Sequence, residues 1–159
     1  MVIFESALVN ALNESYQNHN ITALAYRFEK STRFTFQPCD CLVDSPPDKE
    51  YHKDCYLAIE AKSMTVSGQR PLYFSSHFSD HGRKHQIERM AEFLEKTGRR
   101  GQFAVELKEK PKREAFILPF SQIYDIWSDL NAGVPLNIIR SGKPLIWEGT
   151  FSKGQYKLS

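Results

Sequence analysis

The sequence predicts an α/β domain in which a mixed sheet of five strands is flanked by helices. Three segments repeat apolar residues with the period of an amphipathic helix, at about 3–18, 84–97 and 119–130. Five short stretches of β-forming residues between turn-forming residues are typical of strands: 23–28, 37–43, 57–62, 102–107 and 114–118. The order helix, three strands, helix, two strands, helix favours one mixed sheet with helices on its faces.

The composition is that of a globular protein. The chain has 159 residues, of which 41% are hydrophobic and 25% charged, which excludes a disordered chain and a membrane protein. We expect a single domain over 1–150 and a loose C-terminal tail over 151–159. No stretch has the length of a membrane span and the first residues lack a signal sequence, so we expect a cytoplasmic protein, in the host cytoplasm if a phage or virus encodes it.

The first predicted helix has an acidic residue in its first turn. Five apolar residues recur at helical spacing and form its buried stripe: Phe4, Ala7, Leu8, Ala11 and Leu12. Glu5 lies beside this stripe. It could stabilise the helix dipole, or it could lean over the sheet as a third carboxylate of a metal site, and both interpretations stay open.

Two strands, 37–43 and 57–62, carry the polar side chains that suggest a function. Because side chains alternate along a strand, Glu60 and Lys62 share one face of the second strand, opposite to its apolar residues. The polar run 44–54 is the natural hairpin loop between the two strands. A register that places Asp40 beside Glu60 brings two carboxylates and an ammonium group together.

Two neighbouring carboxylates repel each other, and a bound divalent cation removes that cost. A few hard oxygen ligands with room for phosphate and water suit Mg²⁺, and Mn²⁺ is expected to substitute for it. Lys62 could stabilise or deprotonate an attacking water. The spacing Asp-x(19)-Glu-x-Lys is the pattern of the PD-(D/E)xK nucleases. The alternative is an edge strand on which Glu60 and Lys62 are simply solvated.

The three cysteines, Cys39, Cys41 and Cys55, are predicted to be reduced. Residues two apart on a strand are poorly placed to bond each other, and no second Cys/His pair completes a zinc site. Alternation places Cys39 and Cys41 on one side of their strand and Asp40 on the other.

Positive charge is concentrated in the region 83–113, although the net charge of the chain is only +2. The region holds ten Lys or Arg residues and five Glu residues. It could contact DNA phosphates, or it could be a solvated helix and loop. The polar loop 29–33 could likewise follow a DNA backbone with Lys30, Ser31 and Arg33, or simply connect two strands.

Further predictions concern the second and third helices and the segment that follows them. Gln86 lies one residue before the apolar stripe of the second helix, from where it could turn toward the sheet, although a helical glutamine is usually a surface residue. In the third helix, Trp127 and Leu130 belong to the predicted buried stripe. The segment 135–147 is expected to be a short extended tail.

Several of these segments together resemble the RecU-type Holliday junction resolvases, in the same order along the chain. The resemblance covers about residues 3–130 and rests on short motifs: Phe4-Glu5, 59–63, 72–74, His85-Gln86, 103–105 and 116–118. The archaeal Hjc resolvases are similar in plan, with a helical Glu, an Asp strand and an E-x-K strand. The resemblance implies a restriction-endonuclease-like fold in a single nuclease domain.

The resemblance also implies roles for individual residues. The implied metal ligands are Asp40, Glu60, the main-chain carbonyl of Ala61, and Glu5. The implied catalytic residues are Glu5, Asp40, Glu60, Lys62 and Gln86. The expected DNA contacts are Lys30, Ser31, Arg33, Lys84 and His85. Asp44 is a rival to Asp40, because the loop 44–54 lengthens the interval between the two acids.

The implied activity is that of a Mg²⁺-dependent endonuclease that resolves four-way (Holliday) DNA junctions by paired symmetric nicks, in DNA recombination and repair. Two nicks related by a two-fold axis imply a homodimer. Tyr73, Phe74 and Phe78 could form its interface, with core packing as the alternative. Two rival functions remain: a nuclease of the same fold acting on duplex or other branched DNA, as restriction and repair enzymes do, and a non-catalytic junction-binding module.

Overall fold

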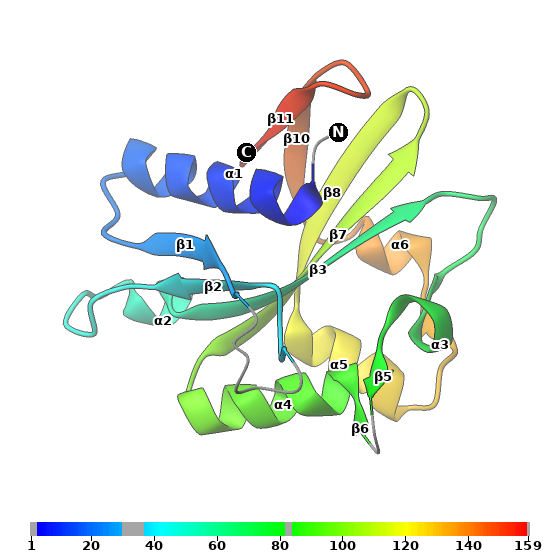
Figure 1. Cartoon of the computed structure of the whole chain (residues 1–159), viewed down its shortest axis with the longest axis horizontal. Helices are drawn as coiled ribbons and strands as arrows, with labels where there is room; N and C mark the ends of the chain where they lie inside the picture. Colours follow the sequence, from blue (N-terminus) through cyan, green and yellow to red (C-terminus); the bar gives the residue numbers. More distant parts are fainter. Residues whose placement is uncertain (1–2, 30–36, 82–83, 159) are drawn as a thin grey trace.

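A seven-stranded mixed sheet forms the centre of the molecule (Figure 1). The structure is a computed structural model and describes residues 3–29, 37–81 and 84–158. In spatial order the strands are β1 (Leu24–Arg27), β2 (Cys41–Asp44), β3 (Leu57–Thr65), β7 (Arg100–Glu109), β8 (Lys112–Pro119), β10 (Lys143–Gly149) and β11 (Gly154–Leu158). Neighbouring strands are antiparallel, except that β3 and β7 are parallel.

The sheet is therefore larger than the five strands predicted from the sequence. The two additional strands, β10 and β11, arise from residues that we expected to form an extended tail and a loose C-terminus. Gly149 ends β10 just before the turn at 150–153 and has a φ of 135°, which favours glycine. Leu145 and Tyr156 of this hairpin are buried in the core. The prediction of a loose tail is therefore wrong for Gly154–Leu158. The sequence did not indicate this strand, because its contacts exist only once the sheet has formed.

Helices cover both faces of the sheet. The three longer ones are α1 (Phe4–Asn18), α4 (Gln86–Thr97) and α5 (Phe120–Ser128). The short elements are α2 (His52–Cys55), α3 (Phe74–His77), α6 (Leu136–Ile139), β4 (Leu72–Tyr73), β5 (Asp80–His81), β6 (Lys84–His85) and β9 (Gly133–Val134). Figure 1 shows α1 on one side of the sheet and α4 and α5 on the other. Two separate hydrophobic clusters match these two layers. Among the described helices, none combines the length and the hydropathy that crossing a membrane requires.

The sheet curls so that both of its edge strands reach α1. The Asn13 side chain of α1 accepts a hydrogen bond from the Ala25 N–H at 2.8 Å and donates one to the Ala25 carbonyl at 2.9 Å. The amide thus occupies the main-chain groups of edge strand β1. At the other edge, the rings of Phe4 and Tyr156 meet edge-to-face with centroids 5.8 Å apart. Helix α1, whose first turn carries Glu5, is therefore fixed from both sides.

Helix α4 begins later and helix α5 ends earlier than predicted. Helix α4 begins at Gln86, because Lys84 and His85 form the short strand β6. It ends at Thr97, as predicted, and its cap Gly98 has a φ of 72° and donates its N–H to the Leu94 carbonyl at 2.9 Å. Helix α5 ends before Leu130, which is 92% exposed, so the prediction that Leu130 is buried is wrong.

A buried acid, Glu106 of β7, links four strands of the sheet. Its carboxylate accepts hydrogen bonds from Ser63 Oγ of β3 at 2.6 Å, from Arg113 Nη2 of β8 at 2.6 Å and from Tyr156 Oη of β11 at 2.7 Å. The Arg113 guanidinium also lies 4.2 Å from the centroid of the Trp147 ring. Arg113 is therefore buried in the fold, so this residue of the basic loop 108–113 is not available to contact a DNA phosphate.

We expect Glu106→Gln to destabilise the protein by about 3 kcal/mol, because it leaves the Arg113 charge buried without a counter-charge. Urea unfolding measures this loss of free energy. The control is Glu109→Gln on the same strand, where the carboxylate is exposed and 3.8 Å from Arg140. The control is expected to change stability by less than about 0.5 kcal/mol. Equal effects of the two substitutions would contradict a structural role for the Glu106 network.

Candidate active site

The pairing of β2 with β3 brings Asp40 to the strand that carries Glu60. Cys41 is the register partner of Ile59, yet the Asp40 N–H also donates to the Ile59 carbonyl at 3.1 Å. Two consecutive residues of one strand thus face a single residue of the other, as in a β-bulge. The Asp40 carboxylate accepts a hydrogen bond from the Ala61 N–H at 2.9 Å, so it reaches β3 beside Glu60.

The same bulge reverses the predicted orientation of Cys39. Cys41 packs in the cluster beneath α1, but Cys39 packs in the cluster beneath α4, because the additional residue shifts the alternation of side chains. All three cysteines are free thiols, as predicted. Burial and then the negative charge of Asp40 raise the pKa of Cys41 to about 12. Burial and then the charge of Glu60 raise the pKa of Cys39.

Glu60, Lys62 and Gln86 form a closed triangle of polar contacts. Glu60 Oε2 lies 2.9 Å from Lys62 Nζ and accepts a hydrogen bond from Gln86 Nε2. Gln86 Oε1 accepts from Lys62 Nζ at 3.0 Å and from the Ser79 N–H at 3.2 Å. The Lys62 ammonium also lies 4.8 Å from the centroid of the Phe78 ring. The sequence indicated the first three residues, but it did not indicate Ser79, and it indicated Phe78 only for a dimer interface or the core.

The alternative of a solvated edge strand is wrong. Strand β3 lies between β2 and β7, and Glu60 is only 2% exposed. Burial and then the nearby charge of Asp40 raise the pKa of Glu60 from its ordinary value of 4.5 to about 8, while Lys62 acts in the opposite direction. A buried carboxyl with a strongly shifted pKa beside specific charged partners is typical of a functional site.

Glu5 lies near this site but is not grouped with the other two acids. It is half-buried in the first turn of α1, its main-chain oxygen lies 4.0 Å from Cys41 Sγ, and its charge contributes to the raised pKa of that thiol. Within residues 3–29, 37–81 and 84–158, no three His, Cys, Asp or Glu side chains form a group that could hold one ion. The role of Glu5 as a third ligand stays a prediction.

The oxygen atoms around Glu60 fit a hard divalent cation. Glu60 Oε1 is buried and has no hydrogen-bond partner among the described residues, which is costly for a carboxylate oxygen. The Asp40 carboxylate is adjacent to it. The Ala61 carbonyl points to the same edge of β3 as the Ala61 N–H that binds Asp40, because both groups of one residue lie on one side of a strand. Carboxylate and carbonyl oxygens are the ligands that Mg²⁺ prefers.

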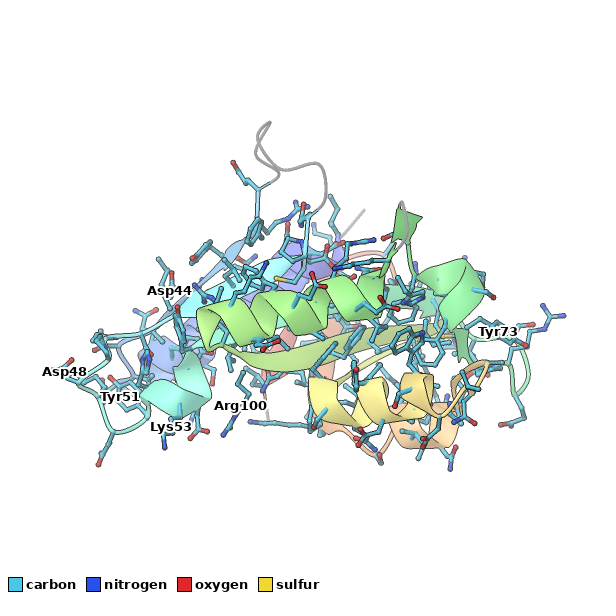
Figure 2. The ribbon with its side chains drawn as sticks, turned by 90° about the horizontal axis from the view of Figure 1, so that it is seen from below. Asp44, Asp48, Tyr51, Lys53, Tyr73 and Arg100 are labelled. Atoms are coloured by element: carbon cyan, nitrogen blue, oxygen red, sulfur yellow. The ribbon has the colours of Figure 1, made fainter. Side chains whose placement is uncertain are left out.

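Asp44 is excluded as a substitute for Asp40. Its carboxylate accepts from Arg99 Nη2 at 2.7 Å and from Tyr26 Oη at 2.5 Å, so both oxygens have partners. Asp44 is at the far end of β2 from Asp40. Figure 2 shows it at the end of the molecule that also carries Tyr51, away from Tyr73 at the opposite end.

The residues predicted to contact DNA fall into three groups. Lys30, Ser31 and Arg33 lie outside the described residues. Lys84 has a 51% exposed side chain that forms an ion pair with Glu92. His85 is half-buried, and both of its ring nitrogens have partners within the fold.

The apolar residues expected at a dimer interface are largely part of the core. Phe74 and Phe78 are each 5% exposed and belong to the cluster beneath α4 and α5, whereas Tyr73 is half-buried. The core-packing alternative is therefore correct for Phe74 and Phe78. Their ring centroids lie 5.3 Å apart, and the Phe78 ring also contacts the Lys62 ammonium.

We expect the stability of the metal-free protein to fall as pH rises from about 5 to 8, because folded Glu60 holds a proton that the unfolded chain releases above its pKa of 4.5. Glu60→Gln lacks this proton equilibrium. The free energy of unfolding of the variant relative to the wild type should therefore rise by about 2–4 kcal/mol between pH 5 and pH 8. Urea unfolding with a chelator present measures it, with the exposed Glu95→Gln as control. A difference that does not change with pH would contradict the raised pKa.

Comparison with known proteins supports a fold but no family. No protein-family profile and no curated protein matches the chain. Among solved structures, the chain is similar to Hjc of Archaeoglobus fulgidus, a Holliday junction resolvase from an archaeal hyperthermophile. The TM-score is 0.55 and the identity 21%, and the match covers 87% of this chain and 89% of the other. The chain thus has a resolvase-like α/β fold, with a seven-stranded sheet in place of the five strands predicted.

Proposed function

We propose that the protein is a Mg²⁺-dependent endonuclease that resolves four-way DNA junctions. The observation that carries the proposal is the buried Glu60 carboxylate. It is close to Lys62, Gln86 and Asp40, and one of its oxygens has no hydrogen-bond partner in the part of the chain that the structure describes. The similarity in fold to an archaeal Holliday junction resolvase supports the choice of branched DNA as substrate.

The proposed chemistry is hydrolysis of a phosphodiester bond. Asp40, Glu60 and the Ala61 carbonyl would hold Mg²⁺, which when bound polarises the scissile phosphate and lowers the pKa of a water. Lys62, already 2.9 Å from Glu60, would orient the attacking water and stabilise negative charge on the phosphate. Gln86 holds Lys62 and Glu60 in their mutual geometry. The water oxygen attacks phosphorus, the bond to the 3′ oxygen breaks, and that oxygen takes up a proton.

Resolution of a junction requires two cuts related by a two-fold axis. A homodimer with two active sites would supply them, since a dimer with two-fold symmetry matches the symmetry of the junction. Phe74 and Phe78 are core residues and are not proposed for its interface.

Cleavage assays test the catalytic assignment. We expect Glu60→Gln and Lys62→Ala each to lower the rate of junction cleavage by at least about 100-fold, because each removes an electrostatic partner of the transition state. Asp40→Asn should abolish cleavage yet still bind the junction. Glu95→Gln, an exposed acid on α4, is the matched control. Rates near that of the wild type in Glu60→Gln and Lys62→Ala would refute the site.

The substrate is tested with a four-way junction, plain duplex, flap and single-stranded DNA, each with and without Mg²⁺. Junction resolution predicts paired symmetric nicks in the four-way substrate and little cutting of duplex. Equal cutting of the duplex would instead indicate a nuclease of the restriction or repair type. Binding of the junction without cutting under every condition would indicate a non-catalytic binding module.

The affinity for DNA should fall steeply with salt, because Lys and Arg side chains that contact phosphates release counterions. The proposed contacts are Lys84, the exposed Lys110 and Lys112, and three residues outside the described ranges: Lys30, Ser31 and Arg33. Lys84→Ala should weaken binding several-fold and reduce the slope of log K against log[salt] by about 1. Lys53→Ala, an exposed lysine of α2, is the control. Affinity independent of salt would contradict a basic DNA-binding surface.

A further inference from the structure

The two nitrogen atoms of His85 both have fixed partners. Nδ1 accepts a hydrogen bond from the Ile87 N–H at 3.1 Å, and Nε2 lies 3.1 Å from the Phe74 carbonyl oxygen. An N–H group can only donate and a carbonyl can only accept, so the partners require a neutral imidazole with its proton on Nε2. Neither nitrogen is left for a DNA phosphate, which disagrees with the predicted role of His85 as a DNA contact.

The Nδ1 contact makes His85 the N-terminal cap of α4. Helix α4 begins at Gln86, and a cap residue satisfies an N–H of the first turn that has no partner within the helix. Histidine is an uncommon cap residue, since Ser, Thr, Asp and Asn are preferred. Its use here calls for a reason beyond capping alone.

The imidazole ring of His85 gives a reason for its use as a cap, because other aromatic side chains hold this ring in place. Six rings contact one another in a closed series, with centroid distances from 5.4 to 6.0 Å: His85, Trp127, Tyr124, Phe120, Phe103 and Phe78. This series joins α5 and β7 to the residue that caps α4. The cap of α4 is thus a rigid ring fixed by the core.

The residue that follows this cap is Gln86, which belongs to the polar triangle. Its Oε1 accepts from both Lys62 and Ser79, and its Nε2 donates to Glu60, so its orientation is determined by three partners. The first residue of a helix is the first to fray when the cap is lost. Loss of the His85 cap therefore acts directly on the side chain that joins Lys62 to Glu60.

We propose that His85 is a positioning residue of the active site, which fixes Gln86, and through it Lys62 and Glu60, by capping α4. The inference rests on the proposed nuclease function and adds to it a residue that contacts neither substrate nor metal. It assigns the contribution of His85 to the rate of cleavage and not to DNA affinity.

Two nearly isosteric substitutions distinguish the roles of the two ring nitrogens of His85. Asn places its Oδ1 where Nδ1 lies and keeps the cap, whereas Gln reaches toward the Phe74 carbonyl and loses the cap. We expect His85→Asn to retain junction cleavage within about threefold of the wild type. His85→Gln and His85→Ala should lower kcat about tenfold, with the KM for the junction changed less than twofold. His52→Gln is the control, since His52 is a half-buried histidine whose ring stacks on Tyr56.

NMR of the imidazole and amide nitrogens tests the same proposal without any cleavage. The wild type should show His85 with its proton on Nε2, and the Gln86 side-chain amide should resonate away from the position of a free glutamine. His85→Asn should keep the Gln86 resonance and His85→Gln should lose it. This readout holds even if the wild type fails to cut DNA, in which case the proposed function fails and the positioning role of His85 is still decided.

Three results would overturn the positioning role. They are a proton on Nδ1 in the wild type, equal damage from Asn and Ala, or a loss of junction affinity in place of a loss of kcat. The last result would restore His85 as a DNA contact.

Discussion

The buried carboxylate of Glu60 is the constraint on which the rest of the site depends. A charged acid in the middle strands of a sheet is costly unless each oxygen has a partner. Lys62 and Gln86 provide partners for one oxygen, whereas the other oxygen has none among the described residues. The free-energy cost of burying this charge raises the pKa of Glu60. The stability of the surrounding fold offsets this local cost.

Much of the site could be predicted from the sequence, because its main features are local. Alternation along one strand placed Glu60 and Lys62 on the same face, and a hairpin between two acidic strands brought Asp40 beside them. The facing of Cys39 could not be predicted in this way, since it depends on a bulge that forms only when Asp40 and Cys41 both meet Ile59. The orientation of the His85 ring was also hidden, because the Phe74 carbonyl and the Trp127 ring that fix it come from other elements.

The three longer helices and five of the strands followed from periodicity, but the short helices and the extent of the sheet did not. The segment that forms β10 and β11 has no strong pattern of its own, and Tyr156 is buried because its hydroxyl meets Glu106, fifty residues earlier in the chain. Pairing of such distant residues leaves no signal in a short window of sequence. Leu130 shows the converse, since its spacing fits a helical stripe but the helix ends before it.

The two thiols beside the acids, Cys39 and Cys41, are poorly suited to coordinate a metal ion. Cys39 and Cys41 lie on opposite faces next to Asp40, and thiols coordinate soft metals such as Zn²⁺ or Cu⁺ only as thiolates. Burial and the neighbouring carboxylates make that deprotonation unfavourable. The two thiols are therefore poor metal ligands at neutral pH. We also expect them to oxidise slowly, because the thiolate is the reactive form. The acids thus disfavour the thiolate form of the two cysteines that lie beside them.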